Sequence, residues 1–431
     1  MMEITPECIR EAVHRKREEI LSWLESLVRF PSENRPPEGN EAEAQQFIGE
    51  ECVRAGLEVD DFRPDEVKGI QEHPHWLSGR HYPEGRVNVV ARWRGGGSGR
   101  SLLLSGHVDV APFEPDEWMR TRPYEPLVTK GRLYGRGTAD MKGGLAACFW
   151  AVKLLREIGF EPAGEVIFES LVDEEYAGGN GTLASRLRGH NADLAVLVEP
   201  TRMELCTASL GAFLGDLVLS GKGGMPYMGS EIPNPINGAA QAIRLFQMWQ
   251  EKWRAENSHS LFQDPGKELN VVLWCIDSKR PGEFTQLGTP LITKISWVVW
   301  CYPGMREEKF YSRFRAFWNE HARSDPDLKP FRIEIHPDFH FVRPWETDPS
   351  HPAVRAVAES FTEYTGKDPK VGGAPFSCDL AHYGDAGGMP CVILGPRGDN
   401  LHAPDEWVEV EDIYELAGIF ALLIAQWCGV E

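Results

Sequence analysis

The sequence lacks the cysteine pattern of a disulfide-bonded or thiolate-metal protein. Its nine cysteines stand singly, without a C-x-x-C pair, and their number is odd. Neither a disulfide framework nor a thiolate zinc knuckle is therefore indicated, and we expect a reducing, cytoplasmic location.

Long apolar runs are also missing. Residues 1–28 carry charges throughout and lack the apolar core and cleavage site of a signal peptide, so we expect a helix of the mature protein. The most apolar run, residues 416–430, is too short to span a bilayer and contains Gln426. We interpret it as a buried terminal helix and predict no transmembrane segment.

Basic residues are outnumbered, with 45 Lys and Arg against 65 Asp and Glu and a formal net charge of -20. Because a phosphate backbone or an anionic membrane requires a basic face, we expect neither nucleic acid nor membrane as a partner. Nucleotide-binding motifs are incomplete as well. Gly135-x-Gly137 lacks the third glycine of a dinucleotide loop, and Gly221-Lys222-Gly223 lacks the Ser or Thr that follows lysine in a P-loop.

The chain has 431 residues, which is more than one hydrophobic core usually serves, so we expect two domains. Apolar runs of strand length alternate with helical spacing as far as about residue 210, which predicts an α/β domain with a largely parallel sheet and helices on both faces. From residue 211 the order strand, helix, strand, strand, helix indicates an inserted α+β module. The predicted domains are a discontinuous one of residues 1–210 and 342–431, and an insert of residues 211–341.

The most informative stretch is residues 102–110. An apolar run of strand length ends there at Ser105-Gly106 and is followed by His107 and Asp109. Ligands of open α/β sheets bind beyond the carboxyl ends of the strands, where an imidazole can bind a metal and a nearby carboxylate can orient its ring. The pair by itself has a common alternative, which is a surface histidine beside a solvated aspartate. Three further histidines, at positions 73, 75 and 81, have no fixed spacing, and we interpret their segment as a polar surface loop.

Other residues of metal-ligand type occupy similar positions. Asp140 precedes a predicted helix, Glu174-Glu175 and Glu199 end predicted strands, and His402 follows the apolar run 391–394. Each carboxylate, taken separately, could lie in a solvated turn or cap a helix. This explanation does not account well for the whole set, because every member lies at the end of a predicted strand or the start of a predicted helix. Two histidines and three carboxylates could hold two divalent ions with one carboxylate bridging, and imidazole with oxygen ligands suits zinc.

With these motifs the sequence resembles the co-catalytic zinc aminoacylases and peptidases, a family that includes acetylornithine deacetylase, succinyl-diaminopimelate desuccinylase and glutamate carboxypeptidase. The resemblance implies a zinc-peptidase-like catalytic domain, with the insert as a lid and dimerisation domain. The implied partners are a small N-acyl substrate and a second copy of the chain. The motifs that carry it cover nearly the whole chain in order: Ser105-Gly106-His107-x-Asp109, Gly137-x-x-Asp140-Met141-Lys142-Gly143-Gly144, Asp173-Glu174-Glu175, Glu199-Pro200-Thr201 and His402-x-x-Asp405-Glu406.

The resemblance also implies a role for each site residue. Asp109 would orient His107, and Glu174 would be the general acid/base that accepts a proton from metal-activated water and later delivers it to the departing amine. The expected activity is hydrolysis of the amide bond in a small N-acyl compound, of deacetylase-like or carboxypeptidase-like type. Cobalt could substitute for zinc. The implied ligands are His107, Asp140 and Glu199 for one ion and Asp140, Glu175 and His402 for the other, with Asp140 bridging.

The lid departs from the family pattern at one position. The family motif G-K-x-x-H supplies an oxyanion-stabilising histidine to the neighbouring subunit, whereas Met225 occupies that position here. A thioether cannot donate a hydrogen bond, and loss of one oxyanion donor costs roughly 3 kcal/mol of transition-state stabilisation. Two interpretations remain: an active amidohydrolase, favoured by the presence of Glu174, and a catalytically weak or inactive relative that binds metal and ligand, favoured by Met225.

Met225 itself has two interpretations. It could replace the oxyanion histidine, or it could pack under the lid near Tyr227 and Met228 while another group donates. The alternative donors are His382 and Arg397, which lie near the predicted ligand His402 in the sequence.

Overall fold

The structure is a computed structural model, which describes residues 4–113, 117–176, 179–225, 231–279, 288–338 and 341–430. The chain divides into two compact units. The first comprises Met1–Ala208, Trp345–Ala374 and Cys378–Glu431, and the second comprises Ser209–Pro344 and Pro375–Ser377. The second unit is thus an insertion into the first.

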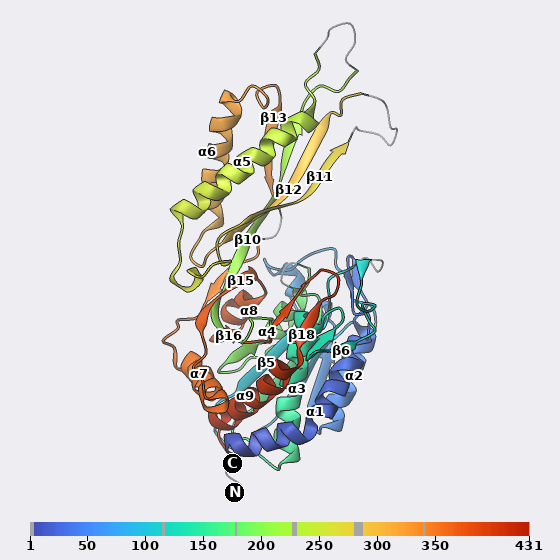
Figure 1. Cartoon of the computed structure of the whole chain (residues 1–431), viewed down its shortest axis with the longest axis vertical. Helices are drawn as coiled ribbons and strands as arrows, with labels where there is room; N and C mark the ends of the chain where they lie inside the picture. Colours follow the sequence, from blue (N-terminus) through green and yellow to red (C-terminus); the bar gives the residue numbers. More distant parts are fainter. Residues whose placement is uncertain are drawn as a thin grey trace. The chain divides into compact units, whose positions relative to one another are not determined.

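A mixed sheet forms the centre of the first unit (Figure 1). Antiparallel strands flank its parallel centre: β4 (Asn88–Trp93) and β3 (Glu58–Phe62) on one side, and the start of β10 (Leu205–Ser220) on the other. The central strands run parallel because helical connections return the chain to the same end of the sheet. Their order is β16 (Cys391–Ile393), β9 (Ala195–Leu197), β5 (Leu102–His107) and β8 (Val166–Leu171).

Helices cover both faces of this sheet, which confirms the predicted α/β architecture. On one face, Leu102 and Leu104 of β5 join a single hydrophobic core with five helices. On the other face, Ser105 of β5 hydrogen-bonds to the Tyr383 hydroxyl at 2.6 Å, and Glu169 of β8 accepts from Arg186 at 2.5 Å. These contacts belong to α8 (Leu380–Asp385) and α4 (Asn180–Arg188). The helices of the first face are α1 (Pro6–Val28), α2 (Ala42–Arg54), α3 (Gly143–Glu157), α7 (Pro352–Thr365) and α9 (Val410–Cys428).

The two terminal helices follow from their sequences. Helix α1 begins after Thr5, whose side chain accepts a hydrogen bond from the backbone N–H of Cys8, and Pro6 occupies the first turn, where a missing N–H costs nothing. The apolar run expected to form a buried terminal helix lies in α9 as far as Cys428, where the helix ends, and the residues of α9 are almost all buried.

A small four-stranded sheet in the first unit brings two distant loops together. Its order is β17 (Gly398–Asp399), β18 (Trp407–Glu409), β7 (Arg132–Tyr134) and β6 (Leu127–Thr129). His402 lies between β17 and β18, and Asp140 follows β7. Pairing of Trp407 with Tyr134 therefore places the His402 loop beside the Asp140 loop.

The second unit is an antiparallel sheet with two helices on one face. The strand order is β11 (Val271–Lys279), β12 (Ile292–Cys301), β10 and β13 (Arg332–Pro337). Helices α5 (Pro235–Glu256) and α6 (Glu307–Ser324) bury aromatic side chains against this sheet. Among these, Trp297 of β12 packs on Phe314 with ring centroids 4.9 Å apart.

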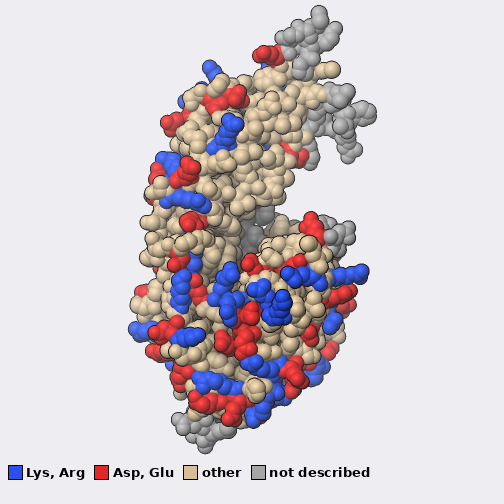
Figure 2. All heavy atoms as spheres, viewed as in Figure 1, with Lys and Arg blue, Asp and Glu red and all other residues tan. Residues whose placement is uncertain are grey.

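Within the described part of the chain, no helix is both long and apolar enough to cross a membrane. All nine cysteines are free thiols. On the face of the molecule that Figure 2 shows, basic and acidic side chains are interspersed.

Candidate metal centre

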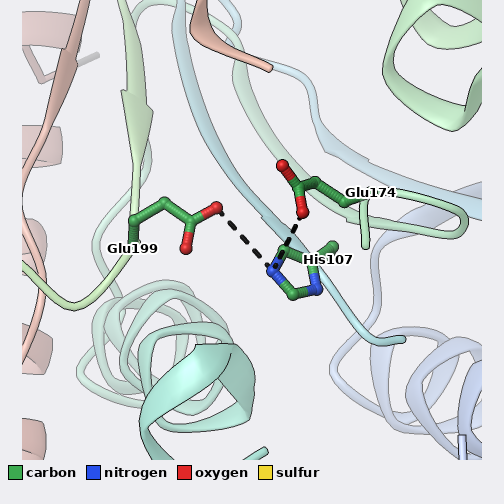
Figure 3. A group of neighbouring side chains, drawn as sticks. All are labelled: His107, Glu174 and Glu199. Carbon is green, nitrogen blue, oxygen red and sulfur yellow. Dashed lines mark ion pairs between the residues drawn. The ribbon is translucent and has the colours of Figure 1, made fainter. Parts of the chain in front are cut away.

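The carboxyl ends of the parallel strands present a cluster of imidazole and carboxylate groups (Figure 3). His107 is the last residue of β5, and Glu174 and Glu199 follow β8 and β9. The Nε2 atom of His107 lies 3.7 Å from Glu199 Oε1 and 3.8 Å from Glu174 Oε2. Figure 3 shows these two carboxylates approaching the same ring nitrogen from different sides.

A second imidazole lies across Asp140 from the first. Asp140 Oδ1 is 3.2 Å from His107 Nε2, and Asp140 Oδ2 is 3.3 Å from His402 Nε2. His402 Nε2 is also 3.0 Å from Glu175 Oε2. The two oxygens of Asp140 thus face two different imidazoles, which is the arrangement that a bridging carboxylate requires.

The donor set fits divalent cations. Ligand atoms of His107, Glu174 and Glu199 all lie within 4.8 Å of one another, and so do those of His107, Asp140 and Glu175. Nitrogen and carboxylate donors in such groups suit zinc and similar ions. Buried carboxylates are costly unless opposite charge balances them, and among the described residues two imidazoles face the four carboxylates. All five predicted ligand residues therefore lie in one cluster, in which Glu174 lies as near to His107 as Glu199 does.

Burial changes the proton affinity of the carboxylates. It raises the pKa of Glu174 well above its ordinary value, and the charges of Glu199 and Asp379 add to this effect. Burial likewise raises the pKa of Glu199 well above its ordinary value and raises that of Glu175.

The imidazoles hold their protons more tightly for a different reason. Burial alone would lower the pKa of His107, but its hydrogen bond to Asp140 and the charge of Glu199 raise it well above the ordinary value. The charge of Glu175 is the main cause that raises the pKa of His402 to about 11. Both imidazoles and the three glutamates therefore favour the protonated form unless cations replace the protons, whereas the pKa of Asp140 is lowered by its two imidazole partners.

We expect zinc to stabilise the protein more at pH 8 than at pH 5. The raised pKa values of Glu174, Glu199 and His107 mean that the folded metal-free protein binds more protons than the unfolded chain, so its free energy of unfolding falls as pH rises between about 5 and 8. The lowered pKa of Asp140 gives the opposite slope, but only below its ordinary value of 3.8. Zinc binds to deprotonated ligands. Its binding therefore opposes the fall in the free energy of unfolding that rising pH causes in the metal-free protein.

The measurement is the melting temperature of metal-free and zinc-loaded protein by differential scanning calorimetry. The difference between the two forms should widen with rising pH. A difference that is constant or narrows across this range would contradict the proposed ligand protonation.

Asp109 contacts both His107 and the two glutamates. His107 Nδ1 donates a hydrogen bond at 2.8 Å to the backbone carbonyl of Asp109, and it lies 3.7 Å from the carboxylate oxygen Oδ1 of the same residue. The carboxylate also accepts hydrogen bonds from the backbone N–H groups of Glu174 and Glu175, at 3.2 and 3.0 Å. Asn34 Nδ2 donates to it at 2.7 Å. One residue thus positions the imidazole through its backbone and the two glutamates through its side chain.

Glu406 organises the Asp140 loop, and sequence reasoning gave it no role. This fully buried carboxylate accepts hydrogen bonds from the backbone N–H groups of Gly137, Ala139 and Asp140 at 2.9 to 3.1 Å. Arg136 Nη1 donates to it at 2.8 Å. The sequence feature that could have identified Glu406 is its fixed spacing from His402 in the motif His402-x-x-Asp405-Glu406.

Asp173 anchors the turn that carries Glu174, and one of its partners, Arg80, comes from the segment expected to be a polar surface loop. Asp173 adopts a positive φ of 72°. Its carboxylate accepts hydrogen bonds from the Tyr82 hydroxyl at 2.6 Å, Arg80 Nε at 2.7 Å and Arg86 Nη2 at 2.9 Å. These three side chains are buried, so the stretch that contains them packs against the turn that carries Glu174. Nothing local in the sequence marks this pairing, because the partners are about 90 residues away.

The remaining candidates occupy different surroundings. Met225 belongs to the second unit and its side chain is 66% exposed, while Tyr227 and Met228 lie outside the described residues. Arg397 forms an ion pair with Asp412, with its Nε donating at 2.8 Å. His382 is buried in α8, with its ring 6.1 Å from that of His75.

Comparison with known proteins adds a family match. The model of peptidase family M20/M25/M40 matches residues 103–426. The N-formyl-4-amino-5-aminomethyl-2-methylpyrimidine deformylase of Halalkalibacterium halodurans is 28% identical, with 96% of each chain covered. The deformylase of the same name from Bacillus subtilis is 27% identical, with 98% of this chain and 97% of the relative covered. The succinyl-diaminopimelate desuccinylase of Nautilia profundicola is 25% identical, with 84% of this chain and 95% of the relative covered.

Solved structures share the fold. Human carnosine dipeptidase 1 superposes with a TM-score of 0.72 at 14% identity, covering 98% of this chain and 99% of its own. A dinuclear metal-binding peptidase of the M20 family from Bacillus subtilis superposes with a TM-score of 0.60 at 15% identity, covering 96% of this chain and 99% of its own. At these identities the likeness concerns the fold alone.

Proposed function

The protein belongs to peptidase family M20/M25/M40, and we propose that within this family it is a metal-dependent deformylase of a small N-formyl aminomethyl heteroaromatic compound. Its relatives include amide-bond hydrolases, and the protein is an amidohydrolase. The observation that carries the finer proposal is the extent of the match. The two deformylases match 96 and 98% of this chain, whereas the desuccinylase from Nautilia profundicola matches 84%.

The side chains of the cluster support this chemistry. Two bound divalent cations, zinc in our proposal, would lower the pKa of a coordinated water and polarise the substrate carbonyl. The ligands would be His107, Asp140 and Glu199 on one side and Asp140, Glu175 and His402 on the other. These residues would fix the substrate carbonyl beside Glu174, because they surround that carboxylate in the cluster.

Glu174 would be the general acid/base. Its raised pKa brings proton exchange nearer to neutral pH, where a base must accept a proton and later return it. The proton must be delivered to the leaving nitrogen because an amide anion is a poor leaving group. The amine is therefore protonated as the C–N bond breaks. Asp109 holds the backbone N–H of Glu174 at 3.2 Å and thereby fixes the base relative to His107.

The test is release of formate from N-formyl-4-amino-5-aminomethyl-2-methylpyrimidine by purified protein with added zinc or cobalt. The N-acetyl analogue, N-succinyl-diaminopimelate and carnosine serve as comparison substrates. We expect the largest kcat/KM for the formyl compound. Faster desuccinylation or dipeptide cleavage would replace the proposed substrate, and metal binding without turnover of any substrate would favour the inactive-relative interpretation.

We also propose a homodimer formed through the second unit. Strand β11 lies at the edge of its sheet and exposes Val272, Trp274 and Ile276, at 43, 62 and 50%. An exposed apolar edge strand is readily paired with a second copy across a two-fold axis. Sedimentation at micromolar concentration should give twice the chain mass of 48.4 kDa, and Trp274→Lys should shift the protein to the monomer. A monomeric parent would contradict this.

Met225→His should raise kcat on the formyl substrate at least tenfold, worth about 1.4 kcal/mol, with little change in KM. A restored imidazole would donate mainly to charge that develops in the transition state. Steady-state kinetics of this variant beside Met225→Leu measure the effect. Equal rates for both variants and the parent would indicate another donor, and His382 would then be tested first because Arg397 is paired with Asp412.

A further inference from the structure

The first turn of α4 joins two segments to the turn that carries Glu174. Gly179 immediately precedes α4 and packs so closely that an added Cβ would lie 3.1 Å from the Cα of Glu174. Asn180 exchanges two hydrogen bonds with the backbone of Leu77, at 2.8 and 2.9 Å. The Thr182 hydroxyl donates to Asp379 Oδ2. The segment that contains Leu77 and the carboxylate of Asp379 are therefore both held next to the Glu174 turn.

Asp379 is a buried carboxylate to which the proposed chemistry assigns no role. It is 5% exposed and directly precedes α8. Its charge contributes to the raised pKa values of both Glu174 and Glu199, so it lies within electrostatic reach of the cluster. It is not needed as a ligand, because the five ligand residues described above already account for two cations.

Two imidazoles line the same region. His382 lies one turn beyond Asp379, and its backbone N–H donates to the Asp379 carbonyl at 2.9 Å. The His382 ring meets the ring of His75 edge to face, with centroids 6.1 Å apart and planes at 68°. His75 comes from the segment that Leu77 ties to α4. The Asp379 carboxylate and the segments that carry the two rings are thus tied through α4 to the turn that carries Glu174.

We propose that Asp379, His75 and His382 form the subsite for the amine portion of the substrate, and that this subsite selects a planar, amino-substituted nitrogen heteroaromatic ring. The proposal rests on the proposed deformylase function. Glu174 delivers its proton to the departing amine, so that amine lies beside Glu174. The Asp379 carboxylate accepts N–H donors of the amino-substituted ring, and the imidazoles pack against its edge and face.

A matched pair of formamides tests the subsite. N-formyl-4-amino-5-aminomethyl-2-methylpyrimidine and N-formylbenzylamine share the reacting group, but only the first has ring nitrogens and a ring amino group. Asp379→Asn keeps the size of the side chain and turns an acceptor oxygen into a donor. A site built to bind a substrate N–H discriminates strongly against analogues that lack it, so the ratio of the two kcat/KM values should fall at least ~30-fold, mainly through KM of the aminopyrimidine.

Binding of the free amine product gives a readout that is independent of turnover. Calorimetry with 4-amino-5-aminomethyl-2-methylpyrimidine should show at least ~10-fold weaker binding to Asp379→Asn than to the parent, at equal zinc content. Asp385→Asn makes the same chemical change at an exposed position of α8 and should behave as the parent. His75→Leu is the second variant, should Asp379→Asn fail to fold, and it should also weaken amine binding.

The outcomes separate this inference from the function on which it rests. An equal fall in kcat/KM for both formamides, or an unchanged affinity for the amine, would assign Asp379 a purely structural role. If the parent releases formate but the ratio does not change, only the subsite is wrong. If the parent hydrolyses neither formamide, the deformylase proposal fails, and the subsite fails with it.

Discussion

Glu174→Gln should lower kcat for a formyl substrate by at least ~100-fold while leaving the bound zinc essentially unchanged. Glutamine has nearly the same shape as glutamate but cannot accept the proton of the attacking water. The Glu174 backbone N–H, which donates to Asp109, is unaffected by the change, so the turn should keep its position. Steady-state kinetics and elemental analysis of the purified variant measure the two effects.

The matched control is Glu175→Gln, the same change one residue further along. Glu175 Oε2 lies 3.0 Å from His402 Nε2, and Glu175 Oε1 accepts a hydrogen bond from the backbone N–H of Ala111 at 3.1 Å. Its carboxylate therefore faces the second imidazole, and the variant should lose zinc. Equal zinc loss in both variants would show that Glu174 is also a ligand, which its 3.8 Å distance to His107 permits.

Asp140→Asn should remove both metal ions together and abolish hydrolysis. Its two carboxylate oxygens face different imidazoles, at 3.2 Å for His107 and 3.3 Å for His402, so one neutral amide weakens both positions. The loop itself should stay in place, because Glu406 holds the backbone N–H of Asp140 at 3.1 Å. Elemental analysis after dialysis against a known zinc concentration gives the stoichiometry.

Glu199→Gln is the control for the bridging role. Glu199 lies 3.7 Å from His107 Nε2, and we assign it to one cation only, so this variant should lose one metal and keep the other. Retention of a full equivalent of zinc by Asp140→Asn would contradict the bridging role. Loss of both ions in Glu199→Gln would instead indicate that the two positions fill only together.

Several features of the site were predictable because they depend on local pattern. An apolar run that ends in a polar residue marks the carboxyl end of a strand, and the carboxyl ends of parallel strands lie at one edge of a sheet. His107, Glu174 and Glu199 follow this rule, and the family match confirms the resemblance drawn from their motifs. Periodicity likewise predicted the α/β sheet, although the flanking strands β3, β4 and β10 proved antiparallel.

Other features depend on partners that are far apart in the sequence. Asp173 is anchored by Arg80, which comes from a segment that reads as a polar loop, and by Tyr82, which directly follows that segment. The segment reads as a loop because arginine and histidine look solvated until their partners are known. Glu406 reaches Arg136 across 270 residues of chain. No periodicity encodes such pairings, since a buried ion pair is specified by two distant side chains that meet only after folding.

The sequence by itself thus determined which residues of metal-ligand type are present, their order and the strand ends that carry them, because these follow from residue chemistry and local periodicity. Tertiary structure decided which of these groups contact one another. It brought the Asp109 carboxylate to the backbone N–H groups of Glu174 and Glu175 as well as to within 3.7 Å of His107 Nδ1, and it joined Asp379 through Thr182 to the helix that packs beside the Glu174 turn. The physical reason is that a hydrogen bond requires its two atoms within about 3 Å, and packing of distant segments alone sets that distance.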